Sequence, residues 1–217
     1  MTYVKICGLT SLDDALFASE SGADYLGFIF YAKSARAMTA ETVAPIVQQL
    51  PRSQKTVGVF VDEHAVTIRV IRYQVKLTLV QLHGDEPIAM LSQVGDCYKA
   101  IRPVDAEEGL MLMESYTQLQ AADLKPNLPD ILIDAYHPTL YGGTGQRLDR
   151  ELALTLNQQD RRVILAGGLT PDNVGDVIRA VRPFAVDVSS GVEFAPGKKD
   201  HGKVRAFIQA VREASID

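Results

Sequence analysis

The segment RVILAGGLTPDNV, residues 162–174, carries the pattern that decides the fold. Its first part is a short run of β-branched and other apolar side chains, which is typical of a strand buried on both faces. Gly167 and Gly168 then predict a tight turn, and Thr170 with Pro171 predicts a helix start, with threonine as N-cap and proline at the first helical position. The stretch therefore predicts a strand, a turn rich in backbone donors and a helix, in that order.

The same strand–turn–helix order recurs along the whole chain. The predicted strands are residues 3–7, 25–30, 55–61, 77–82, 97–101, 131–135, 162–166 and 185–189. The predicted helices are residues 11–21, 40–50, 63–73, 86–93, 106–120, 150–157, 171–181 and 203–214. Strands that alternate with helices predict a parallel sheet with crossover helices. Eight such units predict a (β/α)8 TIM barrel made of one catalytic domain, residues 1–217, and the alternative is a doubly wound open sheet.

Composition narrows the class of protein. The chain has 217 residues and a formal net charge of −5, which argues against a dedicated nucleic-acid binder because such proteins usually carry a basic excess. No apolar stretch approaches the ~18 residues of a membrane helix, and the first residues lack the pattern of a signal peptide. Two cysteines do not make a disulfide framework. We therefore expect a cytoplasmic protein with a small-molecule partner and no nucleic-acid or membrane partner.

Glycine- and serine-rich segments follow the last two predicted strands. Backbone N–H groups at such turns bind dianions, and the loops after strands seven and eight are the common phosphate site of a barrel. The candidate phosphate-binding residues are Gly167, Gly168, Ser189, Ser190 and Gly191, together with Gly143 of a third glycine-rich loop at residues 142–145 that is suited to cover a bound ligand. The alternative is that these glycines only make tight turns.

A thiol and a carboxylate stand at the ends of two separate strands. Cys7 ends the first predicted strand and shares its face with Lys5, while Asp134 shares its face with Leu132, so both side chains point towards the barrel mouth. Strands one and six are not neighbours in the ring. The two groups could therefore face each other across a substrate as general base and general acid. The alternatives are a buried structural cysteine and a carboxylate that caps nearby backbone N–H groups.

Three further polar residues are candidates for substrate binding. Arg36 lies in the loop after the second strand, and its planar fork either recognises a carboxylate or is simply solvated. His83 follows the fourth strand and either lines the mouth or hydrogen-bonds the turn. Asp187 shares a face with Ser189 on the last strand. Cys97 begins the fifth strand, at the opposite end of the barrel, and we expect it to be structural.

Several motifs, in order over nearly the whole chain, resemble the signature segments of phosphoribosylanthranilate isomerase. The motifs are KICGLT (5–10), GADYLG (22–27), QLHGD (81–85), LID (132–134), GGTG (142–145), LAGGLTPDNV (165–174), DVSSGVE (187–193) and GKKD (197–200). The first and the DVSSGVE motif together are highly specific for this family.

The resemblance implies an Amadori rearrangement in tryptophan biosynthesis. Asp134 would protonate the furanose oxygen of N-(5-phosphoribosyl)anthranilate, and Cys7 would remove the proton from sugar C2. Arg36 would hold the anthranilate carboxylate, with Asp187 near the anthranilate part, and the last two glycine- and serine-rich loops would hold the phosphate. The resemblance implies no metal and no organic cofactor.

The sequence departs from the family pattern in two places. Ala35 stands where the family usually has proline, which frees φ in that loop, so we expect Arg36 to be less fixed and the carboxylate to bind more weakly. Leu148 and Arg150 stand where the family usually has aromatic residues, and we expect altered loop packing there.

Two alternatives to this function remain open at the level of sequence. The first is another phosphosugar-handling barrel, such as indoleglycerol-phosphate synthase, expected to use a lysine and glutamate set, or a histidine-pathway isomerase, expected to have aspartate in place of Cys7. The second is a catalytically silent barrel that binds a phosphorylated metabolite. We expect a monomer rather than a homodimer.

Overall fold

The strands of the molecule form a closed parallel barrel. The computed structural model describes residues 1–118, 128–134, 150–157 and 161–215, so Gly143 and Leu148 lie outside the described residues. β1 pairs with β2 on one side and with β8 on the other. This closure confirms the predicted (β/α)8 barrel and excludes the doubly wound open sheet. The barrel strands are β1 (Tyr3–Ile6), β2 (Tyr25–Ile29), β3 (Lys55–Phe60), β4 (Leu79–Leu82), β5 (Cys97–Ile101), β6 (Ile131–Ile133), β7 (Val163–Leu165) and β8 (Ala185–Val188).

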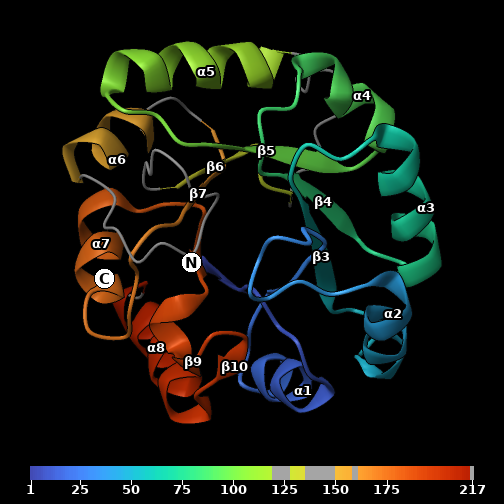
Figure 1. The fold of residues 1–217 in the computed structure, drawn as a ribbon. Coiled ribbons are helices and arrows are strands. Elements are labelled where there is room, and N and C mark those ends of the chain that lie inside the picture. The colour runs from blue at the N-terminus through green and yellow to red at the C-terminus, as the bar shows by residue number, and fades with distance from the viewer. Residues whose placement is uncertain (119–127, 135–149, 158–160, 216–217) are drawn as a thin grey trace.

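The helices form an outer ring that follows the chain order around the strands (Figure 1). They are α1 (Leu12–Glu20), α2 (Ala40–Gln49), α3 (Ala65–Val75), α4 (Leu91–Val94) after the short 3-10 turn η1 (Ile88–Met90), α5 (Ala106–Gln118), α6 (Arg150–Asn157), α7 (Val174–Val181) and α8 (His201–Ala214). Ser11, Thr39 and Asp200 cap three of them, because each side chain accepts a backbone N–H from the first turn.

The predicted start of the seventh helix is wrong. The segment after Gly168 does not enter α7 at Pro171, because α7 begins at Val174 with Asn173 in the N-cap position. The side chain of Asn173 accepts the backbone N–H of Thr170, and the backbone N–H groups of Asn173 and Val174 both donate to the carbonyl of Thr170. This local hydrogen bonding by asparagine makes a separate turn that competes with the helix.

A small hairpin after β8 was not predicted. The 3-10 turn η2 (Ser190–Val192) leads into β9 (Glu193–Ala195), which pairs antiparallel with β10 (Lys198–Lys199). Each strand is too short to give an alternating pattern, so the sequence carries no periodic signal for them. The hairpin lies beside α8 (Figure 1).

The inside of the barrel is apolar towards the amino ends of the strands and polar towards their carboxyl ends. A cluster of buried side chains fills the lower part, formed by Tyr25, Val57, Leu79, Tyr98, Ala100, Leu132, Ile164, Ala166 and Ala185. Since side chains alternate along a strand, the residues two positions further along β4, β6 and β8 continue the same inward face. Those positions are Gln81, Asp134 and Asp187.

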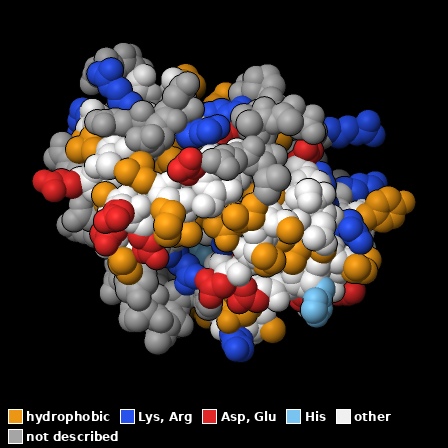
Figure 2. Space-filling view, turned by 90° about the horizontal axis from the view of Figure 1, so that it is seen from above, with side chains coloured by type: hydrophobic (Ala, Val, Ile, Leu, Met, Phe, Trp, Pro, Cys, Tyr) orange, Lys and Arg blue, Asp and Glu red, His pale blue; other side chains and the backbone are white. Residues whose placement is uncertain are grey.

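The surface seen in Figure 2 shows acidic, basic and hydrophobic side chains interspersed, and no broad basic area forms on this face among the residues that are coloured. In the described ranges no helix combines the length and the apolar character that crossing a bilayer requires.

Candidate active site

The candidate residues gather around one cavity at the carboxyl ends of the strands. The space within this cavity, together with the open solvent at its mouth, is about 760 Å³. Of the residues selected from the sequence it is lined by Cys7, Arg36, His83, Asp134, Gly167, Gly168, Asp187, Ser189, Ser190 and Gly191. Only Gly143 is missing from this set, and it lies outside the described residues. Residues separated by up to 184 positions thus meet where a barrel of this kind carries its chemistry.

The thiol of Cys7 sits at the carboxyl end of β1 in space that Gly27 leaves open. A Cβ atom at Gly27 would lie 2.7 Å from the sulfur, so a larger residue there would displace the thiol. Burial raises the pKa of Cys7, while the charge of Lys5 and its hydrogen bond act in the opposite direction. The thiol of Cys7 therefore lies beside a fixed cation that favours its ionised form.

Lys5 and Asp187 form a buried ion pair directly below the cavity. Lys5 Nζ lies 2.7 Å from Asp187 Oδ2, and the lysine side chain is fully buried. Although burial alone would lower the pKa of Lys5, the charges of Asp187 and Cys7 hold it above its ordinary value, so the side chain stays an ammonium group. Asp187 Oδ1 has no hydrogen-bond partner in the described part of the chain, and Asp187 lines the cavity.

Asp134 stands across the cavity from Cys7, directly after β6. Its side chain is 9% exposed, and its backbone N–H donates to the carbonyl of Ile101. His83 Nε2 lies 3.3 Å from Asp134 Oδ2. Gln81 Nε2 lies 2.6 Å from the other ring nitrogen, His83 Nδ1. The carboxylate of Asp134 therefore lies close to the ring of His83, and Gln81 in turn contacts that ring.

Arg36 is held by a carboxylate that lies 157 positions away in the sequence. Its Nε donates to Glu193 Oε1 at 2.8 Å, and its Nη2 donates to Glu193 Oε2 at 2.6 Å. Ser34 Oγ accepts the backbone N–H of Arg36. Two of the five guanidinium N–H groups are used in this fork, which leaves donors that can face a ligand in the cavity. The guanidinium is therefore fixed by Glu193 although Ala35 replaces the family's proline.

Glu193 also binds a buried lysine. Lys199 Nζ donates to Glu193 Oε1 at 2.8 Å, to the carbonyl of Cys7 at 2.6 Å and to the carbonyl of Ser189 at 3.1 Å. Although burial alone would raise the pKa of Glu193, the hydrogen bond from Arg36 and the charge of Lys199 lower it. The hairpin β9–β10 thereby joins the ends of β1 and β8 to the loop that carries Arg36.

The loops after β7 and β8 have the backbone geometry of an anion site. Gly167 and Gly168 have φ values of +96° and +60°, a region that side-chain-bearing residues rarely adopt. A Cβ atom at Gly191 would overlap the carbonyl oxygen of Leu169, so the two loops touch only because residue 191 is glycine. Ser189 Oγ is buried without a hydrogen-bond partner among the described residues.

Comparison with known proteins identifies the family. The family model described as N-(5'phosphoribosyl)anthranilate (PRA) isomerase matches residues 4–210 of the chain. The chain belongs to this family. The N-(5'-phosphoribosyl)anthranilate isomerase of Trichlorobacter lovleyi is 46% identical over 216 residues, covering 99% of this chain and all of that protein. Family membership confirms the predictions of an enzyme and of an isomerase of tryptophan biosynthesis.

Solved structures of phosphoribosylanthranilate isomerases share the fold. One contains monomers generated from the dimeric isomerase of Thermotoga maritima, with 40% identity, a TM-score of 0.84, and coverage of 98% of this chain and 100% of that one. Another is a phosphoribosyl anthranilate isomerase in complex with reduced 1-(o-carboxyphenylamino)-1-deoxyribulose 5-phosphate, with 39% identity, the same TM-score and the same coverage.

Sequence reasoning missed the residues that support the predicted site. Glu193 and Lys199 occur in motifs typical of phosphoribosylanthranilate isomerases, but nothing local pairs them with Arg36 or with the end of β1. Gln81 and Tyr98 were likewise not selected. Gln81 lies two residues before His83, and Tyr98 lies near the start of β5. Both face into the barrel, but this becomes visible only when the inward positions of all strands are aligned.

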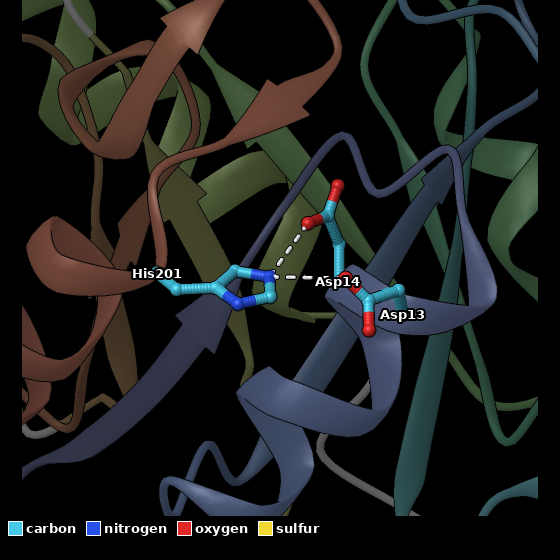
Figure 3. Close-up of side chains that lie close together, drawn as sticks. All are labelled: Asp13, Asp14 and His201. Atoms are coloured by element: carbon cyan, nitrogen blue, oxygen red, sulfur yellow. Dashed lines mark hydrogen bonds and ion pairs between the residues drawn. The ribbon is translucent and has the colours of Figure 1, made fainter.

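A second cluster of ionisable side chains lies outside the cavity. Figure 3 shows the ring of His201, at the start of α8, pointing towards Asp13 and Asp14 of α1. His201 Nε2 lies 2.9 Å from Asp14 Oδ1 and 3.7 Å from Asp13 Oδ2, and the ring stacks on Phe17. These three residues have the spacing of metal ligands, but the ion pair and the ring stacking account for the arrangement by joining α1 to α8.

Proposed function

We propose that the cavity catalyses the Amadori rearrangement of N-(5-phosphoribosyl)anthranilate to 1-(2-carboxyphenylamino)-1-deoxyribulose 5-phosphate, with Asp134 as general acid and Cys7 as general base. One observation carries the proposal: Cys7 and Asp134 line the same cavity from non-adjacent strands, together with the two glycine-rich loops. A thiolate and a carboxylic acid on opposite sides of a sugar are suited to a proton shift between adjacent carbons.

The reaction starts with two proton transfers and ends with a tautomerisation. Asp134 gives its proton to the furanose oxygen as the bond from that oxygen to C1 breaks, and the nitrogen lone pair forms the C1=N bond of a protonated Schiff base. Cys7 as thiolate then removes the proton on C2, and the electron pair of that C–H bond neutralises the nitrogen and gives an enolamine. Protonation at C1 and loss of the hydroxyl proton at C2 give the ketone.

The ends of the substrate would be held by two separate groups. Backbone N–H groups of the loops after β7 and β8 and the buried hydroxyl of Ser189 suit the phosphate dianion. The donors of Arg36 that Glu193 leaves unused suit the anthranilate carboxylate. Asp187 Oδ1, next to Cys7, suits a donor such as the anilino N–H or a sugar hydroxyl.

The alternative functions would need other catalytic residues, or would bind the substrate without converting it. A lysine and glutamate set is expected for an indoleglycerol-phosphate synthase, whereas the groups that face each other in this cavity are a thiol and an aspartate. The silent barrel would bind phosphorylated compounds without converting them. Freshly made phosphoribosylanthranilate distinguishes these cases, because loss of its fluorescence reports turnover. We expect rapid loss with product of unchanged mass, and binding of a product analogue without turnover would contradict the proposal.

Three broader properties are also part of this proposal. We propose one catalytic domain over residues 1–217, since the barrel strands extend from Tyr3 to Val188. We propose a cytoplasmic location, because a reducing compartment keeps the Cys7 thiol available. We propose a monomer, although the Thermotoga maritima isomerase is described as dimeric, and sedimentation equilibrium at micromolar concentration decides between the two.

A further inference from the structure

A continuous series of polar contacts runs through the barrel interior to Asp134. The Tyr98 hydroxyl donates to Gln81 Oε1 at 2.8 Å, Gln81 Nε2 lies 2.6 Å from His83 Nδ1, and His83 Nε2 lies 3.3 Å from Asp134 Oδ2. Tyr98 is fully buried, Gln81 is 1% exposed and His83 is 6% exposed. These side chains are therefore largely shielded from bulk solvent.

The series has a direction that follows from which atoms can donate. Burial holds the pKa of Tyr98 far above its ordinary value, so the phenol keeps its proton and donates it to Gln81 Oε1. In the structure the Gln81 amide is oriented with its oxygen towards Tyr98 and its nitrogen towards His83. An amide nitrogen can only donate, so His83 Nδ1 must accept and therefore carries no proton. The proton of the neutral ring is then on Nε2, the nitrogen that faces Asp134.

Nε2 is the end of the series that lacks a partner. It is buried and makes no hydrogen bond in the described part of the chain, although Asp134 Oδ2 is only 3.3 Å away. Contacts between catalytic groups are often long before the substrate binds and shorten in the complex. Most buried polar side-chain atoms have a hydrogen-bond partner, so an unpartnered ring nitrogen close to a carboxylate suggests a contact that the substrate complex completes.

We propose that Tyr98 and Gln81 hold neutral His83 with its proton on Nε2, so that His83 donates to Asp134 Oδ2 in the substrate complex and fixes the orientation of the catalytic acid. His83 and Gln81 are positioning residues that act through Asp134. The hydrogen bond stabilises the carboxylate that remains when the proton has moved to the furanose oxygen. This step rests on the proposed role of Asp134 as the acid.

The tautomer of His83 is a direct test in the resting protein. Nitrogen-15 spectra of labelled protein separate protonated from unprotonated ring nitrogens, and the chain has four histidines to assign. The expected result is a protonated Nε2 and an unprotonated Nδ1. Gln81→Glu replaces the donor with an acceptor of the same shape, and we expect it to move the proton to Nδ1 or to protonate both nitrogens. A wild-type ring protonated on Nδ1 overturns the proposal.

A matched pair of substitutions tests the consequence for turnover. In His83→Gln the amide nitrogen can reach the position of Nε2 and still donate to Asp134, whereas the shorter side chain of His83→Asn cannot. We expect His83→Asn to lower kcat by about 10- to 100-fold with little change in KM, and His83→Gln to recover part of that loss. The same pair of changes at His64, an exposed residue before α3 whose side chain makes no cap hydrogen bond, serves as control.

The outcomes separate this inference from the function on which it rests. If the tautomer is as expected but His83→Asn and Gln81→Glu both keep wild-type kcat, the positioning role is wrong. If Asp134→Asn keeps wild-type turnover, the acid assignment is wrong, whatever the spectra of His83 show. Gln81→Glu keeps the size of the side chain, so it carries the test if His83→Asn fails to fold.

Discussion

Two opposed effects set the pH at which the Cys7 thiol ionises. Burial raises the pKa of Cys7, and the ammonium group of Lys5 partly offsets that rise. The thiolate fraction must therefore still increase above pH 9. In a Cys97→Ser background, which leaves one cysteine, we expect the rate of iodoacetamide alkylation to keep rising as pH increases beyond 9. A plateau below pH 8 would show that the thiolate is already formed and would contradict this account.

We propose that the guanidinium of Arg36 binds the substrate and does not transfer protons. Because charge-assisted hydrogen bonds contribute about 1.5–3 kcal/mol, Arg36→Ala should raise KM by about 10- to 100-fold while kcat changes far less. Steady-state kinetics measure both values. Arg52→Ala, in an exposed turn before β3, provides the control. A loss confined to kcat would show that Arg36 acts on the reacting atoms instead.

At the scale of loops, the contact between the turns after β7 and β8 depends on one glycine. Gly191→Ala places a Cβ atom against the carbonyl of Leu169, so the loops must separate. Since a displacement of about 1 Å can cost about 100-fold, we expect a loss of that order in kcat/KM. Isothermal titration with a phosphorylated product analogue should show weaker binding, and unchanged affinity would mean that this contact does not shape the phosphate site.

We expect a glycine in α7, unlike Gly191, to tolerate a side chain. Gly175 lies in the first turn of α7, and its nearest contact for a Cβ atom is 3.4 Å away, at the end of the flexible Arg179 side chain. Gly175→Ala should therefore raise the free energy of unfolding by about 0.5–1 kcal/mol and leave kcat/KM unchanged. Urea unfolding measures the first and the fluorescence assay the second. A fall in either would show that α7 tolerates no side chain there.

The hairpin β9–β10 is stabilised by the buried pair of Lys199 and Glu193. Their side chains are 0% and 4% exposed. Lys199→Met leaves the fork between Arg36 and Glu193 in place but removes the donor to the carbonyls of Cys7 and Ser189. We therefore expect it to lower the free energy of unfolding by about 1–3 kcal/mol, as measured in urea. Lys199→Met combined with Glu193→Gln should be destabilised further, because Arg36 then loses its carboxylate partner as well, and equal stability of the two variants would contradict this expectation.

The elements of the barrel were predictable because each has a local signal. Apolar strands and capped helices repeat with their own periods, and β5 and α6 agree with the predicted ranges. The turn before α7 was misjudged because Asn173, rather than Thr170, takes the N-cap position. The hairpin β9–β10 was missed because its strands of three and two residues have no period.

At the scale of the whole molecule, the site residues were predictable only as strand-end positions. The rule that barrels place their chemistry at carboxyl strand ends selected Cys7, His83 and Asp134, and the alternation of side chains along the last strand added Asp187; all four line the cavity. Their partners were not predictable, because pairs such as Arg36 with Glu193 form only when the ring closes.

We propose that one thiol and one carboxylate, brought together by closure of the barrel, carry out the two proton transfers that start the reaction. The decisive measurement is turnover of phosphoribosylanthranilate by wild type, Cys7→Ser, Asp134→Asn and Cys97→Ser, with circular dichroism to establish that each variant is folded. We predict losses of about 100- to 10,000-fold for the first two variants and wild-type turnover for Cys97→Ser. Near-normal turnover in folded Cys7→Ser or Asp134→Asn would contradict the account.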